Sequence, residues 1–293
     1  MPSVDEFFLD PRAVRRAFDA AAKTFDAAAV VHAEIRSRLI ERLDVVRLDP
    51  SVVLDLGAAT GQGSRALKDR YPRARVVAVD LSTAMLREAR KKQRLFRRFQ
   101  RVAADAARLP LARESADLVF SNLMLQWCND PDAIFRESRR VLRPNGLLTF
   151  ASLGPDSLRE LRGAWAAVDE RTHVHRFIDM HDLGDALVRT GFAEPVMDTE
   201  RLTITYSNVE TLFGELRRTG STNQAQGRPR HLTGRSAGQR LREACDRALV
   251  ENVLPVTLEI VYGHAWAGQT RRGGASDRGE TRVPVTSIGR RGP

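Results

Sequence analysis

The chain has 293 residues, of which 42% are hydrophobic and 29% charged, and this composition is typical of one large globular domain. It contains no run of 18 apolar residues and no basic segment before an apolar stretch near residue 1, so we expect neither a membrane-spanning helix nor a secretory signal. The two cysteines, Cys128 and Cys245, lack metal-ligand spacing, which predicts reduced thiols, a cytoplasmic location and no metal site.

The formal net charge is +10, and residues 269–293 contribute six arginines against Asp277 and Glu280. This stretch is rich in Gly, Ser and Thr, so residues 268–293 are expected to form a basic, disordered tail. Basic charge suits nucleic acid, an acidic protein partner, or solubility alone. No aromatic residues are interleaved with the arginines of the tail, which argues against binding of single-stranded nucleic acid.

Hydrophobic periodicity and turn residues divide the chain into alternating helices and strands. Helices are expected at residues 11–43, 64–69, 132–142, 180–190 and 210–250, the last with a break at 220–227, and one more begins near residue 83. Strands are expected at residues 52–56, 75–79, 99–104, 117–122, 147–151 and 256–266, with extended segments in 196–206 and a turn at 143–146. This alternation predicts an α/β fold with a parallel, doubly wound sheet.

We expect one domain over residues 1–267, because no repeat and no linker interrupts the pattern. It divides into a helical N-terminal cap at 11–48, a core at 50–151, and helical lid insertions at 152–179 and 207–250.

The first strand is followed by a glycine-containing turn, Gly57-Ala58-Ala59-Thr60-Gly61-Gln62-Gly63, and the second strand ends at Asp80. Glycine lets the backbone turn tightly and approach a ligand closely. An acidic side chain at the second strand end can accept hydrogen bonds from ribose hydroxyls. A glycine turn alone is often an ordinary loop, but the added acid favours a nucleoside site. The spacing does not match the G-x-G-x-x-G of dinucleotide enzymes.

The D-x-G-x-x-x-G pattern from Asp55 to Gly61 resembles motif I of class I S-adenosylmethionine (SAM) methyltransferases, although Ala59 stands where glycine is common. With the segments 109–111, 117–122 and 142–146, this resemblance covers residues 50–151. It implies a Rossmann-like, seven-stranded, mostly parallel sheet with helices on both faces and a helical lid, and SAM as cofactor.

A narrower resemblance spans residues 14–266. Segments 121–128, 165–173 and 220–223, with the Ala17-Phe18 to Phe25 pattern, are similar to the malonyl-acyl-carrier-protein O-methyltransferases of biotin synthesis. Phe25 stands where that family often has Tyr, and His32 where it often has Gln. The resemblance implies O-methylation of the free carboxylate of malonyl-acyl carrier protein, or of malonyl-CoA.

Two other interpretations stay open. Residues 198–200, Tyr206 and 220–223 also resemble assembly factors of respiratory complex I, which keep the fold and are held to hydroxylate an arginine of a protein partner. Their N-terminal region is less similar, which favours the methyltransferase. A second interpretation is RNA methylation or RNA binding. The Pro-rich tetrapeptide of amino-methylating nucleic-acid enzymes is absent, since residues 121–124 read Ser-Asn-Leu-Met.

The resemblance implies a set of cofactor-binding residues. Gly57, Ala58 and Gly61 would face the methionine part of the cofactor, and Asp80 would bind its ribose. The adenine would contact Leu81, Asp105 and Ala106. Asn122 and Leu123 would close the site at the end of strand four, and Phe18 and Phe25 would close it on the cap side. Asp80 and Asp105 also suit a plain role as caps of the helices that follow. Asp55 is expected to bond loop amides rather than to act in catalysis.

A malonyl carboxylate is ionised at neutral pH, so methylation needs orientation rather than a general base. Arginine is the natural bidentate partner for such an anion, and Arg176 is the candidate, with His173 as a possible positioning residue. A salt bridge from Arg176 to Asp169 or Asp179 is an equally good interpretation. His173 is also compatible with a purely structural hydrogen bond. Trp127 and Trp165 are expected to fill core.

The resemblance also implies an acidic carrier protein as partner, with no membrane. Arg217, Arg218 and the arginines of 94–98 could steer that partner, although each also suits a solvated helix face.

Overall fold

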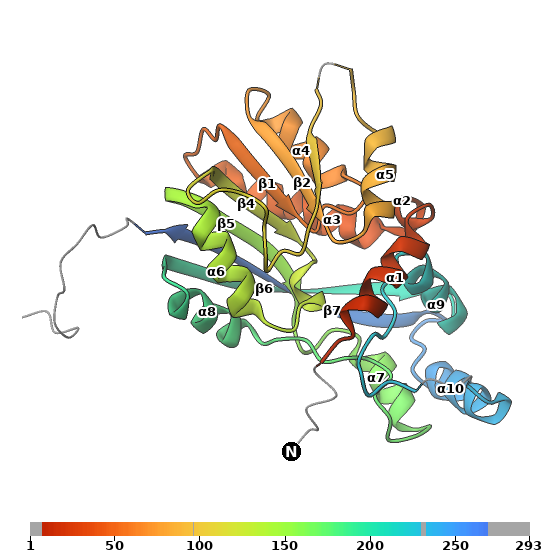
Figure 1. The fold of residues 1–293 in the computed structure, drawn as a ribbon. Helices are drawn as coiled ribbons and strands as arrows, with labels where there is room; N and C mark the ends of the chain where they lie inside the picture. Colours follow the sequence, from red (N-terminus) through yellow and green to blue (C-terminus); the bar gives the residue numbers. More distant parts are fainter. Residues whose placement is uncertain (1–7, 96, 230–232, 269–293) are drawn as a thin grey trace, which may run out of the picture.

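The computed structural model describes residues 8–95, 97–229 and 233–268, which form a seven-stranded sheet with the order β3-β2-β1-β4-β5-β7-β6 (Figure 1). The strands are β1 (Val52–Leu56), β2 (Arg75–Asp80), β3 (Gln100–Ala103), β4 (Ala116–Asn122), β5 (Leu142–Leu153), β6 (Phe192–Tyr206) and β7 (Leu254–Ala267). Strands β1 to β5 pair in parallel, whereas β7 runs antiparallel to both β5 and β6. The predicted mostly parallel sheet is confirmed.

Helices connect and flank these strands. They are α1 (Pro11–Ala21), α2 (Phe25–Ala28), α3 (Val30–Glu41), η2 (Arg42–Val45), α4 (Gln62–Arg70), α5 (Thr83–Lys91), η3 (Leu125–Trp127), α6 (Pro131–Val141), α7 (Arg159–Ala166), α8 (Met180–Arg189), α9 (Val209–Arg218) and α10 (Arg235–Arg247). Helices α1 and α6 begin as their sequences predict, because Asp10 and Asp130 accept hydrogen bonds from the first-turn amides and a proline follows each.

Residues 11–43, expected to be helical throughout, are instead divided into three α-helices. Between α1 and α2, the Thr24 hydroxyl donates to the carbonyl oxygens of Ala21 and Arg218, at 3.1 and 2.8 Å, and Phe25 is buried next to it. These contacts reach across about 190 residues of sequence, so local helix propensity did not reveal them. After this division, α1 packs against α5 and α2 against α9.

The expected turn at residues 143–146 lies inside β5, which is longer than predicted. Asn145 has a φ of 61°, and the pairing of β4 with β5 shifts register between Ala116 and Leu118. The turn residues therefore make an irregularity within one strand rather than a connection between two elements.

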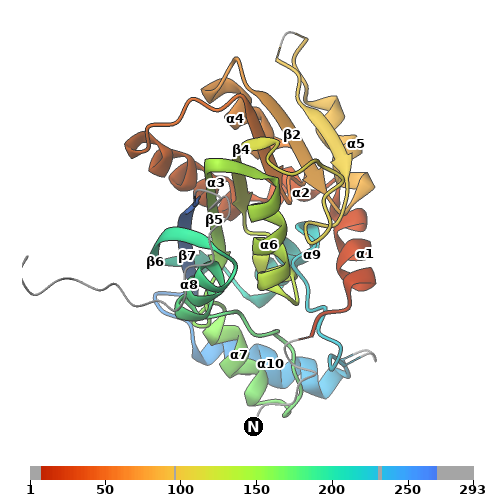
Figure 2. The same cartoon turned by 60° about the vertical axis from the view of Figure 1, so that its left-hand side comes forward.

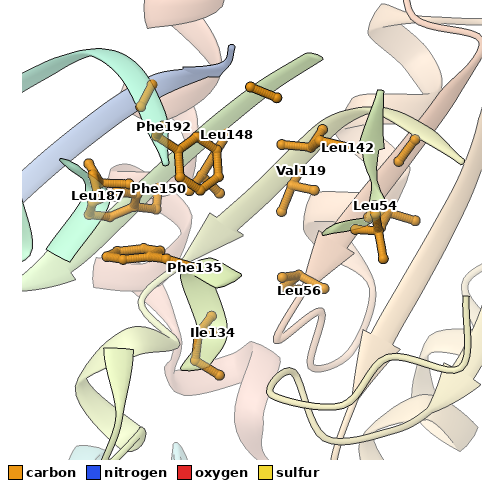
Figure 3. Packing of buried hydrophobic residues seen from close by; sticks show 14 of the residues in the cluster. Leu54, Leu56, Val119, Ile134, Phe135, Leu142, Leu148, Phe150, Leu187 and Phe192 are labelled. Atoms are coloured by element: carbon orange, nitrogen blue, oxygen red, sulfur yellow. The ribbon is translucent and has the colours of Figure 1, made fainter. Parts of the chain in front are cut away.

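Two apolar layers cover the two faces of the sheet. Helices α6 and α8 cover one face, where Phe135, Phe150 and Leu187 pack together (Figure 3). Helices α3, α4 and α5 cover the other, with Leu39, Leu67 and others buried against it. Helices on both faces are the expected arrangement for a buried parallel sheet.

A third apolar cluster lies beyond the sheet. It joins α7, α9 and α10 to the ends of β6 and β7 through residues that include Leu161, Tyr206, Leu212, Leu241 and Val256. Helices α7 and α10 lie side by side below the sheet in both views (Figure 2). These helices are the ones expected to form a lid, and the division of residues 1–267 into cap, core and lid stays a prediction. Of the expected tail at 268–293, residues 269–293 fall outside the described residues.

Candidate functional site

A cavity of about 310 Å³ lies where β1, β2 and β4 end, beside the loop that follows β1. All but one of the cofactor-binding residues expected from the sequence line it. These are Phe18, Phe25, Gly57, Ala58, Asp80, Leu81, Asp105, Ala106, Asn122 and Leu123 on its wall, with Gly61 in the adjoining loop between the wall residues Thr60 and Gln62. Strand ends of a parallel sheet meet at one edge, so the predicted residues come together there.

The loop after β1 turns through left-handed backbone conformations. Gly57 and Gly61 have φ values of 72° and 77°, and Ala59 has a φ of 44°. A Cβ on Gly57 would overlap the Met124 side chain, and one on Gly61 would lie 2.7 Å from the Phe99 ring. Glycine is therefore required at both positions by neighbouring side chains as well as by the turn.

Asp80 holds this loop from the end of β2. Its Oδ2 accepts from the Ala59 amide at 2.8 Å and its Oδ1 from the Ser82 amide at 2.7 Å. Burial raises the pKa of the Asp80 carboxyl to about 6, which the two amide bonds partly oppose. Each oxygen keeps a further lone pair toward the cavity. Asp105 makes a similar local bond, since its Oδ1 accepts from the Ala107 amide at 2.9 Å.

Asp55 makes local hydrogen bonds, as expected, and its partner Ser64 contributes both its backbone amide and its hydroxyl. Its Oδ2 accepts from the Ser64 hydroxyl at 2.6 Å, which fixes the start of α4. Burial raises the pKa of this carboxyl to about 6, and the nearby Arg36 opposes the shift. Arg36, on α3, also lines the cavity, and its own pKa is lowered by burial. No local motif marked Arg36, because α3 precedes the nucleoside-binding pattern.

The N-terminal cap is bonded to the rim of this cavity. The Ser82 hydroxyl donates to Asp19 Oδ1 at 2.5 Å, and Asp26 bonds to the hydroxyl of Thr60 and the ammonium of Lys92. These bonds place the rings of Phe18 and Phe25 on the cavity wall.

At the end of β4, Asn122 and Leu123 close the floor of the cavity. Asn122 donates from Nδ2 to the His32 carbonyl oxygen at 3.1 Å, while its buried Oδ1 has no hydrogen-bond partner among the described residues. Leu123 has a φ of 55°. Trp127 follows and lines the cavity, so its expected role as core filler is wrong.

A second cavity of about 240 Å³ adjoins the first, between the sheet and helices α7 and α9. Among the described residues, His32, Leu123 and Trp127 line both cavities. The second cavity is mostly apolar, with side chains such as Leu153, Leu161, Phe177, Leu212, Phe213 and Leu216. The pattern along the chain did not predict it.

The two residues expected to position a substrate are separated. His173 lines the second cavity, where its Nε2 lies 2.8 Å from Asp169 Oδ1 and its ring stacks on Trp165 at 3.5 Å between centroids. Arg176 is exposed and lies outside both cavities as the described residues define them. His175, between them in sequence, is buried on the wall of the second cavity.

The arginines expected to steer an acidic partner lie at several places. Arg217 is exposed at the rim of the second cavity, and Arg218 donates to the Ala27 carbonyl oxygen at 3.2 Å. Arg94 and Arg97 pair with Asp69 at 3.7 and 2.8 Å.

The residues of the first cavity fit a nucleoside that carries an amino-acid chain. The ribose needs an acceptor such as Asp80, the amino acid's ammonium needs an acceptor such as the unpaired Asn122 Oδ1, and its carboxylate needs a cation such as Arg36. In the described part of the chain, no group of three or more His, Cys, Asp or Glu side chains could hold a metal ion.

Comparison with known proteins agrees with this geometry. Residues 54–150 match a family described as a methyltransferase domain. The chain is 50% identical over 275 residues to a malonyl-(acyl-carrier protein) O-methyltransferase of Laribacter hongkongensis, an alignment that covers 91% of this chain and 93% of that one. It is 45% identical to the enzyme of the same name from Halorhodospira halophila, over 97% of both chains.

The chain belongs to the malonyl-(acyl-carrier protein) O-methyltransferase family.

Solved structures agree on the fold. A protein of Bacillus halodurans is 18% identical, with a TM-score of 0.58 over 80% of this chain and all of that one. A SAM-dependent methyltransferase of Thermotoga maritima is also 18% identical, with a TM-score of 0.53 over 87% of this chain and 99% of that one. This member of the family therefore has the class I methyltransferase fold and uses S-adenosyl-L-methionine as its methyl donor. Within the described ranges, no helix is long and apolar enough to cross a membrane.

Proposed function

We propose that this protein methylates the free carboxylate of malonyl-acyl carrier protein, in the biotin pathway. One observation carries the proposal: the cavity lined by the expected cofactor-binding residues shares three wall residues with a second, mostly apolar cavity, in a chain 50% identical to a relative named for this reaction. The first cavity would hold the cofactor and the second the acyl thioester. The arginine hydroxylase of complex I assembly and the RNA enzyme are not favoured, because the curated relatives carry neither name.

The chemistry asks little of the protein beyond orientation. S-adenosyl-L-methionine supplies, when bound, a methyl group on a positively charged sulfur that a carboxylate oxygen can displace. The carboxylate is already ionised at neutral pH, so no side chain has to remove a proton. The histidines nearest the junction agree with this, because burial lowers the pKa values of His32 and His175 to about 4 and makes both weak bases.

The cofactor-binding roles are part of the proposal. Asp80 would accept from the ribose, Arg36 would pair with the cofactor's carboxylate, and Asn122 Oδ1 would accept from its ammonium. Their places on one cavity wall and the partnerless Asn122 oxygen support these roles. Phe18 and Phe25 would exclude water from the cap side.

The test is mass spectrometry of malonyl-acyl carrier protein after incubation with the protein and S-adenosyl-L-methionine. We expect the mass of one methyl ester, made with the wild type and lost or strongly reduced with Asp80→Ala. The control acceptor is acetyl-acyl carrier protein, which lacks the free carboxylate and should stay unmodified. An unchanged malonyl-carrier mass, with protein that binds S-adenosylhomocysteine, would contradict the proposal.

The roles of Arg176 and His173 at the substrate remain predictions. If Arg176 pairs with the malonyl carboxylate, Arg176→Ala removes a bond worth about 1.5–3 kcal/mol and should slow transfer roughly 10- to 100-fold. Affinity for S-adenosylhomocysteine should stay the same. An unchanged rate would leave Arg176 a surface residue, in keeping with its place outside both cavities.

An acidic carrier protein and a cytoplasmic location also belong to the proposal. Arg217 supports the first, because it is exposed at the rim through which an arm from a carrier would enter the second cavity. The absence of a spanning helix from the described residues is compatible with the second.

A further inference from the structure

Three residues line both cavities and define the junction between them. They are His32, Leu123 and Trp127. Leu123 is apolar, and the Trp127 ring packs between Phe18 and His175, with centroids 5.2 and 5.0 Å away. A methyl donor in the first cavity and an acceptor in the second can meet only where the cavities join. The side chains at the junction are therefore placed to contact the acceptor group.

His32 lines both cavities, and one buried polar atom of its ring has no partner among the residues that the structure describes. Its Nδ1 is shielded from solvent and has no hydrogen-bond partner within the described ranges of the chain. The His32 backbone is fixed by Asn122, whose Nδ2 donates to the His32 carbonyl oxygen at 3.1 Å, and its ring contacts Phe25 at 5.1 Å between centroids. A buried polar atom without a partner destabilises the folded protein, unless a ligand supplies the partner.

We propose that His32 is the residue that binds the acceptor carboxylate, by donating a hydrogen bond from Nδ1–H of its neutral imidazole to one carboxylate oxygen. This inference rests on the proposed function, because it places the malonyl thioester in the second cavity with its carboxylate at the junction.

A neutral donor suits this reaction better than a cation at the same place. Burial and the nearby Arg36 both lower the pKa of His32 to about 4, so the ring carries no charge at neutral pH. A neutral N–H orients the anion but does not neutralise it, so the oxygen keeps its nucleophilic charge for the transfer. His32 gives up no proton, because the carboxylate arrives ionised.

The other candidates at the acceptor fit less well. Arg176 lies outside both cavities, and Arg217 is exposed at the far rim of the second one. Arg36 lines only the first cavity, one helical turn from His32, where the cofactor's own carboxylate would lie. The indole N–H of Trp127 is the remaining donor at the junction, and the experiment separates it from His32.

The test is the affinity of the cofactor-free protein for two probes, measured by calorimetry at pH 7.5. The first probe is malonyl-pantetheine, which has the free carboxylate, and the second is its methyl ester, which carries one more methyl group and no charge. We expect His32→Leu to weaken binding of the acid by about 10- to 100-fold and that of the ester by less than about threefold. His32→Asn should restore acid binding, because its Nδ2 lies near the place of the histidine Nδ1.

Three further variants complete the experiment. His264→Leu removes a half-buried histidine of β7 that lines neither cavity, and it should change neither affinity. Trp127→Phe and Arg176→Ala should both keep the preference for the acid. Retained affinity for S-adenosylhomocysteine checks that each variant is folded.

Equal losses for acid and ester in His32→Leu, or no loss at all, would overturn the role of His32. An acid-selective loss in Trp127→Phe or Arg176→Ala, with none in His32→Leu, would overturn it as well. Failure of the proposed function looks different, because the wild type would then form no methyl ester on malonyl-acyl carrier protein.

Discussion

At the scale of single residues, Asp80 combines two demands that oppose each other. Its carboxylate accepts the amides of Ala59 and Ser82 and thereby shapes the cofactor loop. Burial beside the cavity raises the pKa of the Asp80 carboxyl to about 6, so ionising this carboxyl costs free energy in the folded protein. The residue is suited to binding at the expense of stability.

Asp80→Asn should therefore stabilise the cofactor-free protein at high pH. Native Asp80 keeps its proton up to about pH 6, whereas the unfolded residue loses it near 3.8, so its contribution to stability falls as pH rises through this window and stays low above it. Between pH 5 and pH 8, the stability of Asp80→Asn relative to wild type should rise by about 1–1.5 kcal/mol. Urea denaturation at the two pH values measures this difference.

Comparing the two pH values removes any change in hydrogen bonding that is common to both. The same variant should bind S-adenosylhomocysteine about tenfold more weakly, because the amide offers one acceptor oxygen instead of two. A relative stability that is independent of pH would show that Asp80 is not the group whose pKa is raised.

At the scale of elements, the short helix α2 connects the cap to the cofactor loop. Asp26 bonds to the Thr60 hydroxyl, the Gln62 amide and the Lys92 ammonium, which belong to the loop after β1, to α4 and to the residue that follows α5. Bonds at a partly exposed site add little to global stability. They do fix the cap against the rim of the cavity, where the cofactor must enter and leave.

Asp26→Ala should accelerate dissociation of S-adenosylhomocysteine by about 5- to 20-fold, since loss of about 1–2 kcal/mol of polar contact loosens the cap. Stopped-flow displacement measures the rate. Asp44→Ala is the matched control, because it removes an acid that pairs with Arg70 at 2.5 Å and lines neither cavity. Equal dissociation rates for the two variants would exclude a role of α2 in retaining the cofactor.

At the scale of the whole molecule, the net charge of +10 bears on how a carrier protein arrives. Surface charge acts over about 8–10 Å at physiological ionic strength, so it affects encounter with an acidic protein more than binding of a small ligand. Arg217 places part of this charge at the rim of the second cavity.

Raising the salt concentration from about 50 to 500 mM should therefore weaken binding of malonyl-acyl carrier protein by at least about tenfold, but binding of malonyl-pantetheine by less than about threefold. Calorimetry on the full-length chain gives both values. Arg217→Ala should reduce the salt dependence for the carrier, with Arg75→Ala, at the exposed start of β2, as control. Equal salt dependence of the two ligands would contradict electrostatic steering.

The sequence by itself determined the order of helices and strands, the glycine turn and the acid at Asp80. These features are local: a strand followed by Gly57 and an acid one strand later must meet at one sheet edge, whatever surrounds them. That most of the expected residues line one cavity could be predicted for the same reason. The lengths of β5 and β6 and the division of residues 11–43 could not, because bonds such as Thr24 to Arg218 join segments far apart in sequence.

Only the tertiary structure shows the second cavity and the residues that we propose to contact the methyl acceptor. His32 and Arg36 lie on α3, before the first strand, and their alignment with the cavities depends on how α3 packs against β4 and β5. The second cavity exists because α7 and α9, from segments after residue 152, fold back over the same sheet end. A cavity formed by elements distant in sequence leaves no periodic trace along the chain, so it arises only from packing.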